Sequence, residues 1–465
     1  MLLVVEVIDV EMIKLYRSDT FIMLGFTRVE EFVYMARPIM VILGGGAGKG
    51  LYPLTKTRSK AAVPFGTKYR LVDIAISNCI NSEYYQIFVL TQFNSGSVNR
   101  HIVQTYQIPP FLDGFVDPRA ASLTADNRHW YQGTADAVRQ NLGTICGAAE
   151  ISNAQQVMIV SGDHLYHMDY RKVMDFHLKK GADVTLCVNP VQRDRASTLG
   201  IAQWDDDHRV TRFVEKPKDD ALIDSLQIPH DAEEFPGAFL GSMGLYVFEI
   251  EWLKQFLTDH SDRHEFGRDF LPGVVGSSRV FAYAFEDYWE NVGDIRSYYD
   301  AMMQLCKPNP RFDFDPVINN HRHRLFTRGR SLPPAKINGA TFENAMIAEG
   351  AILEVRTQIS NSLVGMRAFI DTDVVIEDSI LFGCDEYEAI PERQRRFQAG
   401  EIPLGIGSGS RLSRCIIDKN VRIGRNVILE NRSGVMFADA EKYSILDGII
   451  VVPRDTVIED NFRIE

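Results

Sequence analysis

Short apolar runs alternate with longer amphipathic stretches between residues 39 and 300. The runs are rich in branched side chains and are bounded by Gly, Asn or Asp, which is typical of buried strands. They span residues 40–43, 87–91, 157–161 and 184–188, and helix-like patterns cover residues 134–149 and 170–180. This alternation predicts an α/β domain built around a mostly parallel sheet.

Polar clusters follow three of the predicted strands, at residues 44–50, 91–95 and 162–164. In open α/β sheets, ligands bind at the carboxyl ends of the strands. We therefore expect the three clusters to converge on one crevice.

A different period begins after about residue 337, where branched apolar residues recur every six positions. They are Ile347, Leu353 and Ile359, then Val364, Ile370 and Ile376, then Ile417, Ile423 and Leu429. Neither a strand nor a helix has this period, but a β-helix solenoid does, because each of its sides takes one hexapeptide and turns one branched side chain inward. Residues 383–400 break the period and are predicted to form a protruding loop.

These patterns divide the chain into residues 1–34, an N-terminal extension, residues 35–306, a first domain, residues 307–336, a linker, and residues 337–465, the solenoid. The linker is rich in proline and carries a basic run, HRHRLFTRGR, at residues 321–330. We interpret this run as a solvated loop, with anion binding as the alternative.

Composition narrows the function classes. The net charge of -12 argues against a nucleic-acid partner, and no apolar run is long enough to cross a membrane. The six cysteines are scattered without a C-x-x-C pair, which favours buried thiols in a reducing cytoplasm. Acidic residues interrupt the apolar N-terminus, so it is read as neither a signal nor a transit peptide. Residues 1–34 are either a dispensable extension or the product of an upstream start codon.

A glycine-rich loop follows the first strand in the stretch ILGGGAGKGLYPL, residues 42–54. The phosphate-binding P-loop is excluded, because Leu43 stands at its first glycine and Gly50 at its hydroxyl residue. The dinucleotide pattern G-x-G-x-x-G fails as well, since its last position falls on Lys49 or Leu51. What remains is a turn whose backbone N–H groups can approach an anion, or a bare turn.

Motifs further along the chain decide between these alternatives. They are LYPLTKTRSKAAVPFGTKYRLVDIAISNCINS from Leu51, WYQGTADAVRQNL from Trp130, SGDHLYHMDY from Ser161, FVEKP from Phe213, GSMGLYVF from Gly241, FGRDFLP from Phe266, YWENVGDI from Tyr288 and IIDKNVRIGRN from Ile416. With the glycine loop they resemble the sugar-nucleotide pyrophosphorylases over about residues 38–465. The resemblance is closest to the glucose-1-phosphate adenylyltransferases (ADP-glucose pyrophosphorylases) of the bacterial and plant glycogen–starch type.

The resemblance implies a Rossmann-like nucleotidyltransferase domain with a mixed, mostly parallel sheet, followed by a left-handed parallel β-helix of hexapeptide repeats. The implied reaction converts ATP and glucose 1-phosphate to ADP-glucose and pyrophosphate for glucan synthesis, with Mg²⁺ as cofactor. The sugar phosphate is already ionised, so the reaction needs alignment and charge neutralisation rather than a general base.

The resemblance also implies roles for individual residues. Catalysis falls to Lys49, Lys60 and Asp163, and the Mg²⁺ ligands are Asp163 and Asn291. The nucleotide-binding residues are Gly44, Gly45, Gly46, Gln92, Tyr131, Gly133, Thr134 and Asp136, and those for the sugar phosphate are Gly200, Glu215, Lys216, Ser242, Asp269 and Trp289. The alternatives are a turn cap for Asp163, a solvated lysine for Lys60 and a core aromatic for Trp289.

Three residues depart from the family pattern. Gly50 stands where the family places an arginine, Asn291 where it places an aspartate, and Ala61 where it places a proline after the lysine. Lysine lacks the bidentate fork of arginine, so Lys49 is an incomplete substitute on a phosphate. Three hypotheses follow: an active adenylyltransferase, a catalytically impaired regulatory subunit or paralogue, and a hexapeptide acyltransferase with a relic N-terminal domain.

Family members are tetramers regulated by phosphorylated metabolites, which implies a homotetramer or a heterotetramer with a paralogous subunit. Lys419, Arg454 and Arg58 match basic effector positions, although exposed charges on a solenoid are the alternative. The family's early effector lysine is replaced by Thr57. The preference for adenine rests on the resemblance alone.

Overall fold

The computed structural model describes residues 14–18, 21–25, 37–123, 128–314 and 323–465. The chain forms two units, Met1–Arg37 and Pro38–Glu465. In the first unit, β1 (Lys14–Ser18) pairs antiparallel with β2 (Phe21–Gly25). The two explanations for residues 1–34, a dispensable extension and an upstream start codon, stay predictions. Most of these residues lie outside those that the structure describes.

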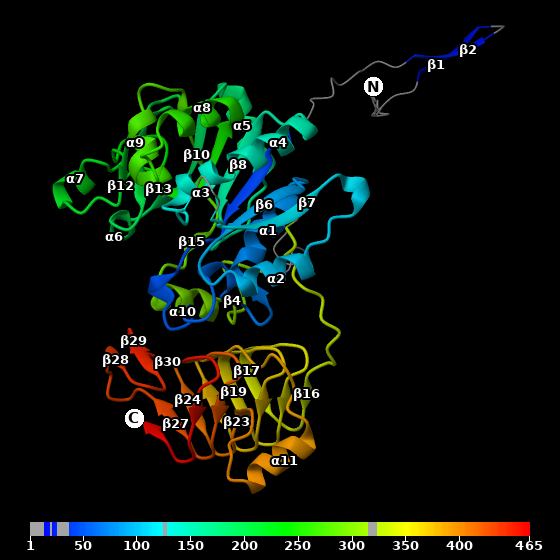
Figure 1. The fold of residues 1–465 in the computed structure, drawn as a ribbon, viewed down its shortest axis with the longest axis vertical. Helices are drawn as coiled ribbons and strands as arrows, with labels where there is room; N and C mark the ends of the chain where they lie inside the picture. The colour runs from blue at the N-terminus through cyan, green and yellow to red at the C-terminus, as the bar shows by residue number, and fades with distance from the viewer. Residues whose placement is uncertain (1–13, 19–20, 26–36, 124–127, 315–322) are drawn as a thin grey trace. The chain divides into compact units, whose positions relative to one another are not determined.

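The α/β domain contains all four predicted strands, within one or two residues at each end except for β10, which runs on to Val191 (Figure 1). Its strands are β3 Ile39–Leu43, β4 Pro64–Phe65, β5 Tyr69–Arg70, β6 Gln86–Thr91, β7 Phe115–Ala120, β8 Gln156–Ser161, β9 His164–Tyr166, β10 Val184–Val191, β11 Gly200–Trp204, β12 Val210–Glu215, β13 Phe239–Glu249, β14 Val280–Ala284 and β15 Trp289–Asn291. In the main sheet β3 pairs in parallel with both β6 and β8, so the carboxyl ends of the three strands lie at one edge. The sheet is mixed, because β13 runs antiparallel to β8 and β10.

Helices connect these strands. They are α1 Leu71–Asn81, α2 Gly96–Thr105, α3 Thr134–Gln140, α4 Leu142–Ser152, α5 Tyr170–Lys180, α6 Arg193–Ala196, α7 Asp220–Asp224, α8 Ile250–Asp259, α9 Leu271–Val274 and α10 Ile295–Gln304, with the short turns η1 Lys49–Leu51, η2 Lys60–Ala62 and η3 Pro110–Leu112 and the π-helical turn η4 Phe266–Phe270. The prediction for 170–180 is confirmed by α5. The helix-like pattern predicted over 134–149 is helical except at Asn141 (φ −105°, ψ 4°), which leaves the helical region and separates α3 from α4.

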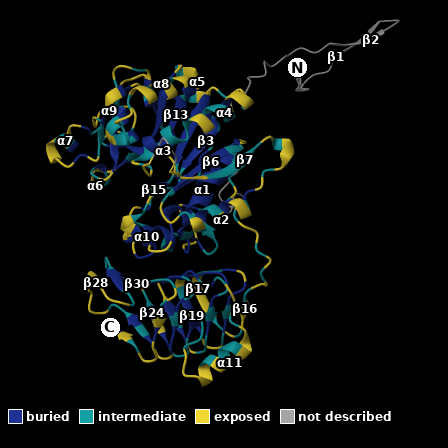
Figure 2. Cartoon of the chain, in the orientation of Figure 1, coloured by how far each residue is buried: buried dark blue, intermediate teal, exposed yellow. Residues whose placement is uncertain are grey.

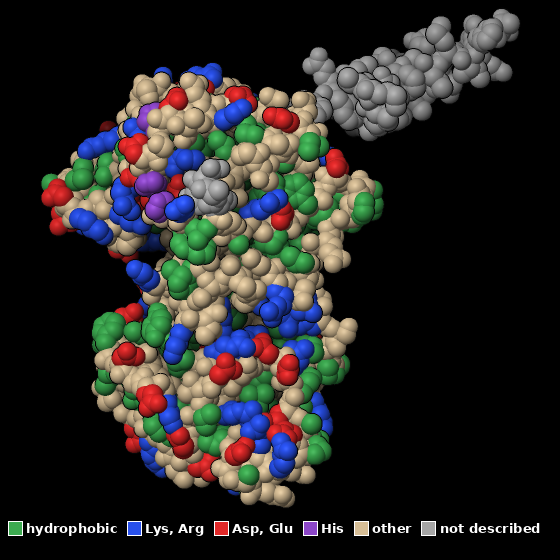
Figure 3. Space-filling view, viewed as in Figure 1, with side chains coloured by type: hydrophobic (Ala, Val, Ile, Leu, Met, Phe, Trp, Pro, Cys, Tyr) green, Lys and Arg blue, Asp and Glu red, His purple; other side chains and the backbone are tan. Residues whose placement is uncertain are grey.

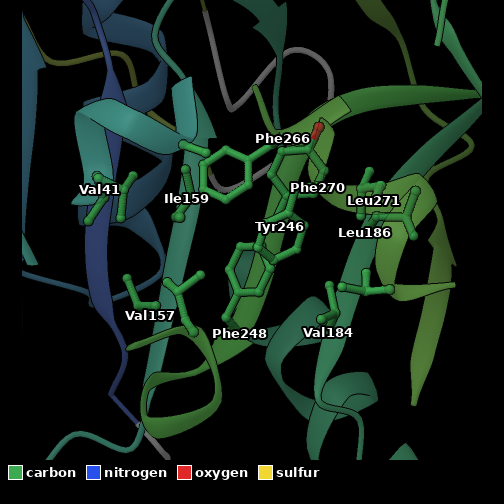
Figure 4. Packing of buried hydrophobic residues seen from close by; sticks show 14 of the residues in the cluster. Val41, Val157, Ile159, Val184, Leu186, Tyr246, Phe248, Phe266, Phe270 and Leu271 are labelled. Carbon is green, nitrogen blue, oxygen red and sulfur yellow. The ribbon is translucent and has the colours of Figure 1, made fainter. Parts of the chain in front are cut away.

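The core of this domain lies between the sheet and its helices (Figure 4). Val41, Val157 and Ile159 from neighbouring strands face Tyr246 and Phe248 of β13, and the rings of η4 close the cluster. Burial of this apolar surface is the main force that holds the sheet edge, and therefore the crevice, in place.

The second half of the chain is a parallel β-helix. Its strands are β16 Lys336–Ile337, β17 Thr341–Ile347, β18 Ile352–Leu353, β19 Gln358–Val364, β20 Phe369–Ile370, β21 Val375–Glu377, β22 Ile380–Leu381, β23 Gly405–Ile406, β24 Arg411–Ser413, β25 Cys415–Ile417, β26 Arg422–Ile423, β27 Ile428–Glu430, β28 Phe437–Asp439, β29 Ser444–Leu446, β30 Ile449–Val452, β31 Val457–Ile458 and β32 Arg463–Ile464. Eight of the nine period-six residues are buried, and the ninth, Ile347 in the first coil, packs against the same core. The six-residue period is thereby confirmed, and Figure 2 shows the buried interior of the coil.

The loop predicted at 383–400 is partly wrong, because it contains α11 (Ile390–Gln398). Pro391 at the start of the helix, Glu392 in the first turn and two arginines in the last are favourable for a helix and its dipole. Arg393 lies over the ring of Phe369 at 3.6 Å, which holds the helix against the coil. The break in the six-residue period was interpreted as a loop without weighing these local helix signals.

One apolar cluster joins the two domains. It contains Leu71 and Ile74 of α1, Tyr298 of α10, and Leu363 and Ile416 of the β-helix. The part of the basic run that the structure describes, residues 323–330, is only partly solvated. Phe326 N–H donates to Ser77 Oγ at 2.8 Å, and Thr327 Oγ1 donates to buried Asp73 at 2.7 Å. The interpretation as a solvated loop is therefore confirmed only in part: the segment contains no helix or strand and Arg324, Arg328 and Gly329 are exposed, but Phe326 and Thr327 are tied to α1.

All six cysteines are free thiols, as predicted. Within the part of the chain that the structure describes, every helix is too short or too polar to span a bilayer.

Candidate functional site

A cleft of about 790 Å³ opens at the carboxyl edge of β3, β6 and β8. Gly45 after β3, Gln92 after β6 and Asp163 after β8 all line it. The expected convergence of the three polar clusters is confirmed, and it follows directly from the parallel pairing of these strands.

The glycine loop forms one wall of the cleft. Gly45, Gly46 and Lys49 line it, whereas Gly44 lies behind them and donates its N–H to Leu90 O at 2.8 Å. A Cβ on Gly46 would meet nothing within 4 Å, so this backbone is open to a ligand. Gly48 is required for conformation and space: its φ is 62°, and an added Cβ would lie 2.7 Å from Lys60 Cβ.

The predicted nucleotide side forms the next wall, where Gln92, Tyr131, Gly133 and Thr134 line the cleft. The Gln92 amide receives the Tyr131 N–H at 2.6 Å and donates to Tyr131 O at 3.2 Å, so it holds this wall to the end of β6. Asp136 does not line the cleft. It accepts the Gln132 N–H at 2.8 Å and therefore positions the wall from behind.

On the opposite side, the cleft is lined by four of the residues predicted for the sugar phosphate, Gly200, Glu215, Lys216 and Ser242. An added Cβ on Gly200 would lie 2.6 Å from Glu215 Oε2, so glycine makes room for this carboxylate. Burial raises the pKa of Glu215, although nearby Lys216 opposes the shift. Lys216 Nζ lies 3.6 Å from Glu215 Oε1, and its side chain is 60% exposed, so the ammonium is also accessible to a phosphate.

Two residues predicted for the sugar side lie outside the cleft lining. Asp269 accepts the N–H groups of His264 and Glu265 at 3.0 and 2.9 Å, so it positions Glu265 rather than facing a ligand. Trp289 is buried, and its Nε1 donates to His164 Nδ1 at 3.3 Å. The core-aromatic alternative for Trp289 is the arrangement that the structure shows.

Lys60, Asp163 and Asn291 meet at the base of the cleft. Lys60 Nζ lies 2.8 Å from Asp163 Oδ2 and 3.3 Å from Asn291 Oδ1. Two elements bring them together: β15, which ends at Asn291, pairs antiparallel with β9, which begins directly after Asp163. Burial alone would raise the pKa of Asp163, but the Lys60 ammonium, His164 and two hydrogen bonds outweigh it and hold that pKa below its usual range.

This geometry overturns the solvated-lysine alternative for Lys60, which is buried.

The same geometry also tests whether Mg²⁺ fits at the base of the cleft. Two hard oxygen donors converge on one cationic atom, which stands in for the metal position. Among the described residues no group of three or more His, Cys, Asp or Glu is placed to hold a metal. Mg²⁺ usually takes one or two carboxylates and completes its shell with water and substrate phosphates, so Asp163 and Asn291 fit such a site.

The departure at Gly50, in the η1 turn, contacts the turn that follows the departure at Asn291, the last residue of β15. A Cβ on Gly50 would lie 2.1 Å from Gly293 O, so an arginine here requires the turn after Asn291 to move. Lys49 lines the cleft, while Gly50 does not. Ala61 is buried within the η2 turn that carries Lys60.

Sequence reasoning missed several residues of the cleft. His164, Tyr246, Glu265 and Gly267 line it, and each lies within or beside a recognised motif. His164 could have been found from its place directly after Asp163. Burial lowers the pKa of His164 to about 4, against the opposing charge of Asp163, so the imidazole is neutral near pH 7.

A second cavity of about 60 Å³ lies where the α/β domain meets the β-helix. The three predicted effector residues, Arg58, Lys419 and Arg454, line it together with Lys68, Arg70 and Arg330, which sequence reasoning missed. Arg330 belongs to the basic run that was considered for anion binding. Figure 3 shows Lys and Arg side chains gathered on this part of the surface. We call this the junction cavity.

Asp385 is the one carboxylate among the described residues that line the junction cavity. Lys419 Nζ lies 2.8 Å from its Oδ1, and Arg454 pairs with its Oδ2. Arg58 instead makes a bidentate pair with Asp418, with both N–O distances 2.9 Å. Burial lowers the pKa of Arg70 to about 10, which reflects the cost of holding this cation out of water.

An α/β domain with a glycine-lined cleft at its sheet edge, followed by a β-helix, defines a nucleotidyltransferase class of protein. Comparison with known families matches residues 39–308 to nucleotidyl transferase and residues 330–462 to the GLGC left-handed parallel beta-helix domain. The first match covers more than half of the chain, so the protein belongs to the nucleotidyl transferase family. The two domains together are characteristic of the glucose-1-phosphate adenylyltransferase family, and the predicted fold is confirmed.

Proposed function

We propose that this nucleotidyltransferase of the ADP-glucose pyrophosphorylase type makes ADP-glucose and pyrophosphate from ATP and glucose 1-phosphate, with Mg²⁺. The observation that carries the proposal is the meeting of Lys60, Asp163 and Asn291 below the glycine loop. It brings a cation and two oxygen ligands to the place where the phosphates of a nucleotide on this loop would lie.

The residues of the cleft suit this reaction without a general base. A sugar-phosphate oxygen attacks the α-phosphorus of ATP, and pyrophosphate leaves with the electron pair of the broken P–O bond. Lys216 holds the sugar phosphate, Glu215 accepts from sugar hydroxyls, and Lys49 and Lys60 offset charge on the nucleotide phosphates. Mg²⁺, when bound by Asp163 and Asn291, neutralises phosphate charge and aligns the leaving group. The neutral His164 accepts the indole N–H of buried Trp289, which fixes the imidazole at the wall of the cleft.

The test is pyrophosphate release by the purified chain from glucose 1-phosphate with ATP, UTP or thymidine triphosphate in turn. Release with ATP above the other nucleotides supports the proposal. Release only with another nucleotide would overturn the choice of substrate. Asp163→Asn, which removes the charged metal ligand, should abolish release and serves as the negative control.

The second candidate is a catalytically impaired regulatory subunit, which the neutral ligand Asn291 and the absence of an arginine at position 50 favour. In that case the chain alone releases no pyrophosphate, and Asn291→Asp restores it. Gly50→Arg is a poor first rescue, because its side chain meets the backbone of Gly293. Acyl transfer from coenzyme A would support the acyltransferase alternative, although residues 337–465 contain no histidine.

We also propose that the junction cavity binds a phosphorylated metabolite, with Arg58, Lys419 and Arg454 among its ligands. Six cationic side chains around one carboxylate support an anionic ligand. A glucan-synthesis role, a cytoplasmic location and a homo- or heterotetramer belong to the same proposal. Light scattering of the purified chain measures the oligomeric state, and a monomer would contradict the tetramer.

A further inference from the structure

The charge balance at the base of the cleft is unusual for a divalent-cation site. Asp163 brings one negative charge, and Asn291 brings none. The Lys60 ammonium already offsets this charge at 2.8 Å and also donates to Asn291 at 3.3 Å. It therefore uses the same two oxygen atoms that would ligate a metal.

We propose that the Lys60 ammonium and a divalent cation are alternative occupants of one position between Asp163 and Asn291. The inference rests on the proposed function for the identity of the cation. Magnesium ligands lie about 2.0–2.1 Å from the ion, so a metal held by both oxygens would take the place of the ammonium. One carboxylate cannot neutralise both cations, and their mutual repulsion favours only one at a time.

The backbone and Cβ of Lys60 are held in place, whereas its ammonium can shift towards the cleft. Lys60 N–H donates to Gly46 O at 3.3 Å, and its Cβ fills the space beside Gly48. These contacts anchor the backbone and the first carbon of the side chain. The ammonium contacts Asp163 and Asn291, which line the cleft, so nucleotide phosphates bound there would attract it away from Asp163.

Two consequences follow for binding. A divalent cation should bind weakly to the chain without nucleotide, because it must displace Lys60. Nucleotide phosphates should strengthen metal binding by offering the ammonium another partner. Removing the Lys60 charge should then strengthen metal binding, although the same change weakens contacts with the phosphates.

The test measures Mn²⁺ binding to the full chain without nucleotide, by calorimetry or by the electron paramagnetic resonance of free Mn²⁺. Lys60→Met is expected to tighten binding by at least about tenfold, since a like charge leaves the site. Lys49→Met is the matched control, because Lys49 lines the same cleft without an ion pair to Asp163. It should tighten binding by less than about threefold through long-range charge alone. Lys60→Arg, which keeps the charge, should not tighten it.

A Lys60→Met protein that melts like the wild type but binds Mn²⁺ no tighter than Lys49→Met overturns the proposal. A second experiment, lysine labelling, uses the unmutated chain, so the proposal can be tested even if Lys60→Met fails to fold. Saturating Mn²⁺ should increase modification of Lys60 by an amine-reactive ester, read by mass spectrometry, and unchanged labelling also overturns the proposal. The outcome is separate from the proposed function, because neither measurement requires turnover. If the chain releases no pyrophosphate but shows the expected Mn²⁺ effects, the proposed function is contradicted and the proposal about Lys60 is not.

Discussion

The cleft and the junction cavity handle charge in opposite ways. Three carboxylates and two lysines line the cleft among the described residues, whereas six cations and one carboxylate line the junction cavity. The cleft is also far larger, about 790 Å³ against about 60 Å³. A polyphosphate entering the cleft must therefore bring a cation with it, while the junction cavity suits a small anion on its own. This difference in lining charge explains why the proposed substrate needs a metal ion and the proposed effector does not.

The two regions also differ in how deeply an ion pair beside each of them is buried. The Lys60 and Asp163 side chains are 11% and 20% exposed, whereas those of Arg58 and Asp418 are 5% and 2% exposed. The first pair faces a space in which a ligand can replace one partner. The second lies between two domains, with both side chains almost fully buried. We therefore expect the first pair to govern chemistry and the second to govern stability.

The largest expected effect is on stability at the junction. Arg58→Met leaves Asp418 charged, buried and without its bidentate partner, and breaking such a pair costs about 3–5 kcal/mol. Denaturant unfolding measures the loss. Arg356→Met is the control, because the Arg356 and Asp373 side chains are 68% and 48% exposed, and loss of such an exposed pair should leave the unfolding free energy nearly unchanged. Equal losses in the two variants would contradict a structural role for the buried pair.

The next effect concerns turnover in the cleft. Asp163→Asn removes its one charged metal ligand, and pyrophosphate release should fall by at least about 10²–10³-fold. Asp183→Asn is matched in burial, since the Asp183 side chain is 19% exposed and pairs with Arg279 away from the cleft. It should leave turnover within about twofold of the wild type, as expected for a surface ion pair. If both variants lose activity equally, the cleft is not the catalytic site.

The pH dependence of stability gives a smaller effect. The folded pKa of His164 is about 4, below its ordinary 6.5, and Asp163, Lys60 and Arg195 are the charges that act on it. Between these values the unfolded chain binds a proton that the folded chain does not. The unfolding free energy therefore falls as pH drops from 6.5 towards 4, by about 3 kcal/mol at most.

His164→Asn keeps an acceptor near Trp289 Nε1 and cannot titrate. Its unfolding free energy should vary less with pH across this window than that of the wild type. His230→Asn, at an exposed position, should retain the wild-type slope. A His164→Asn slope equal to the wild-type slope would show that the imidazole is not held neutral by burial.

The smallest effect tests the junction cavity as an anion site. Asp385→Asn removes the carboxylate that competes for Lys419 and Arg454, and inorganic phosphate should then bind about tenfold more tightly by calorimetry. Asp455→Asn is the control, because Asp455 also pairs with Arg454, at 3.1 Å, but does not line the cavity. Weaker phosphate binding in Asp385→Asn would mean that the carboxylate orders the cations instead of competing with the anion.

Local patterns were sufficient for much of the fold. The strands after which the cleft residues stand, the α5 helix and the six-residue period follow from apolar spacing, which burial on one face imposes directly. The break at Asn141 and the helix at 390–398 were missed. At Asn141 the side-chain amide donates to the Tyr131 hydroxyl and to Ala137 O and competes with the helix. At 390–398 the break in the six-residue period was interpreted as a loop, although Pro391 and the charges in the first and last turns favour a helix.

The sequence by itself determined the order of elements, the glycine loop and the residue types available to the cleft. Only the tertiary structure decided their partners. Asn291 reaches Lys60 across 231 residues, and Asp418 reaches Arg58 across 360. Such pairs depend on how separate segments pack, which no local spacing encodes. The same packing placed Trp289 and Asp269 behind the cleft wall, turned Lys60 inward to Asp163, and brought Gly293 against Gly50.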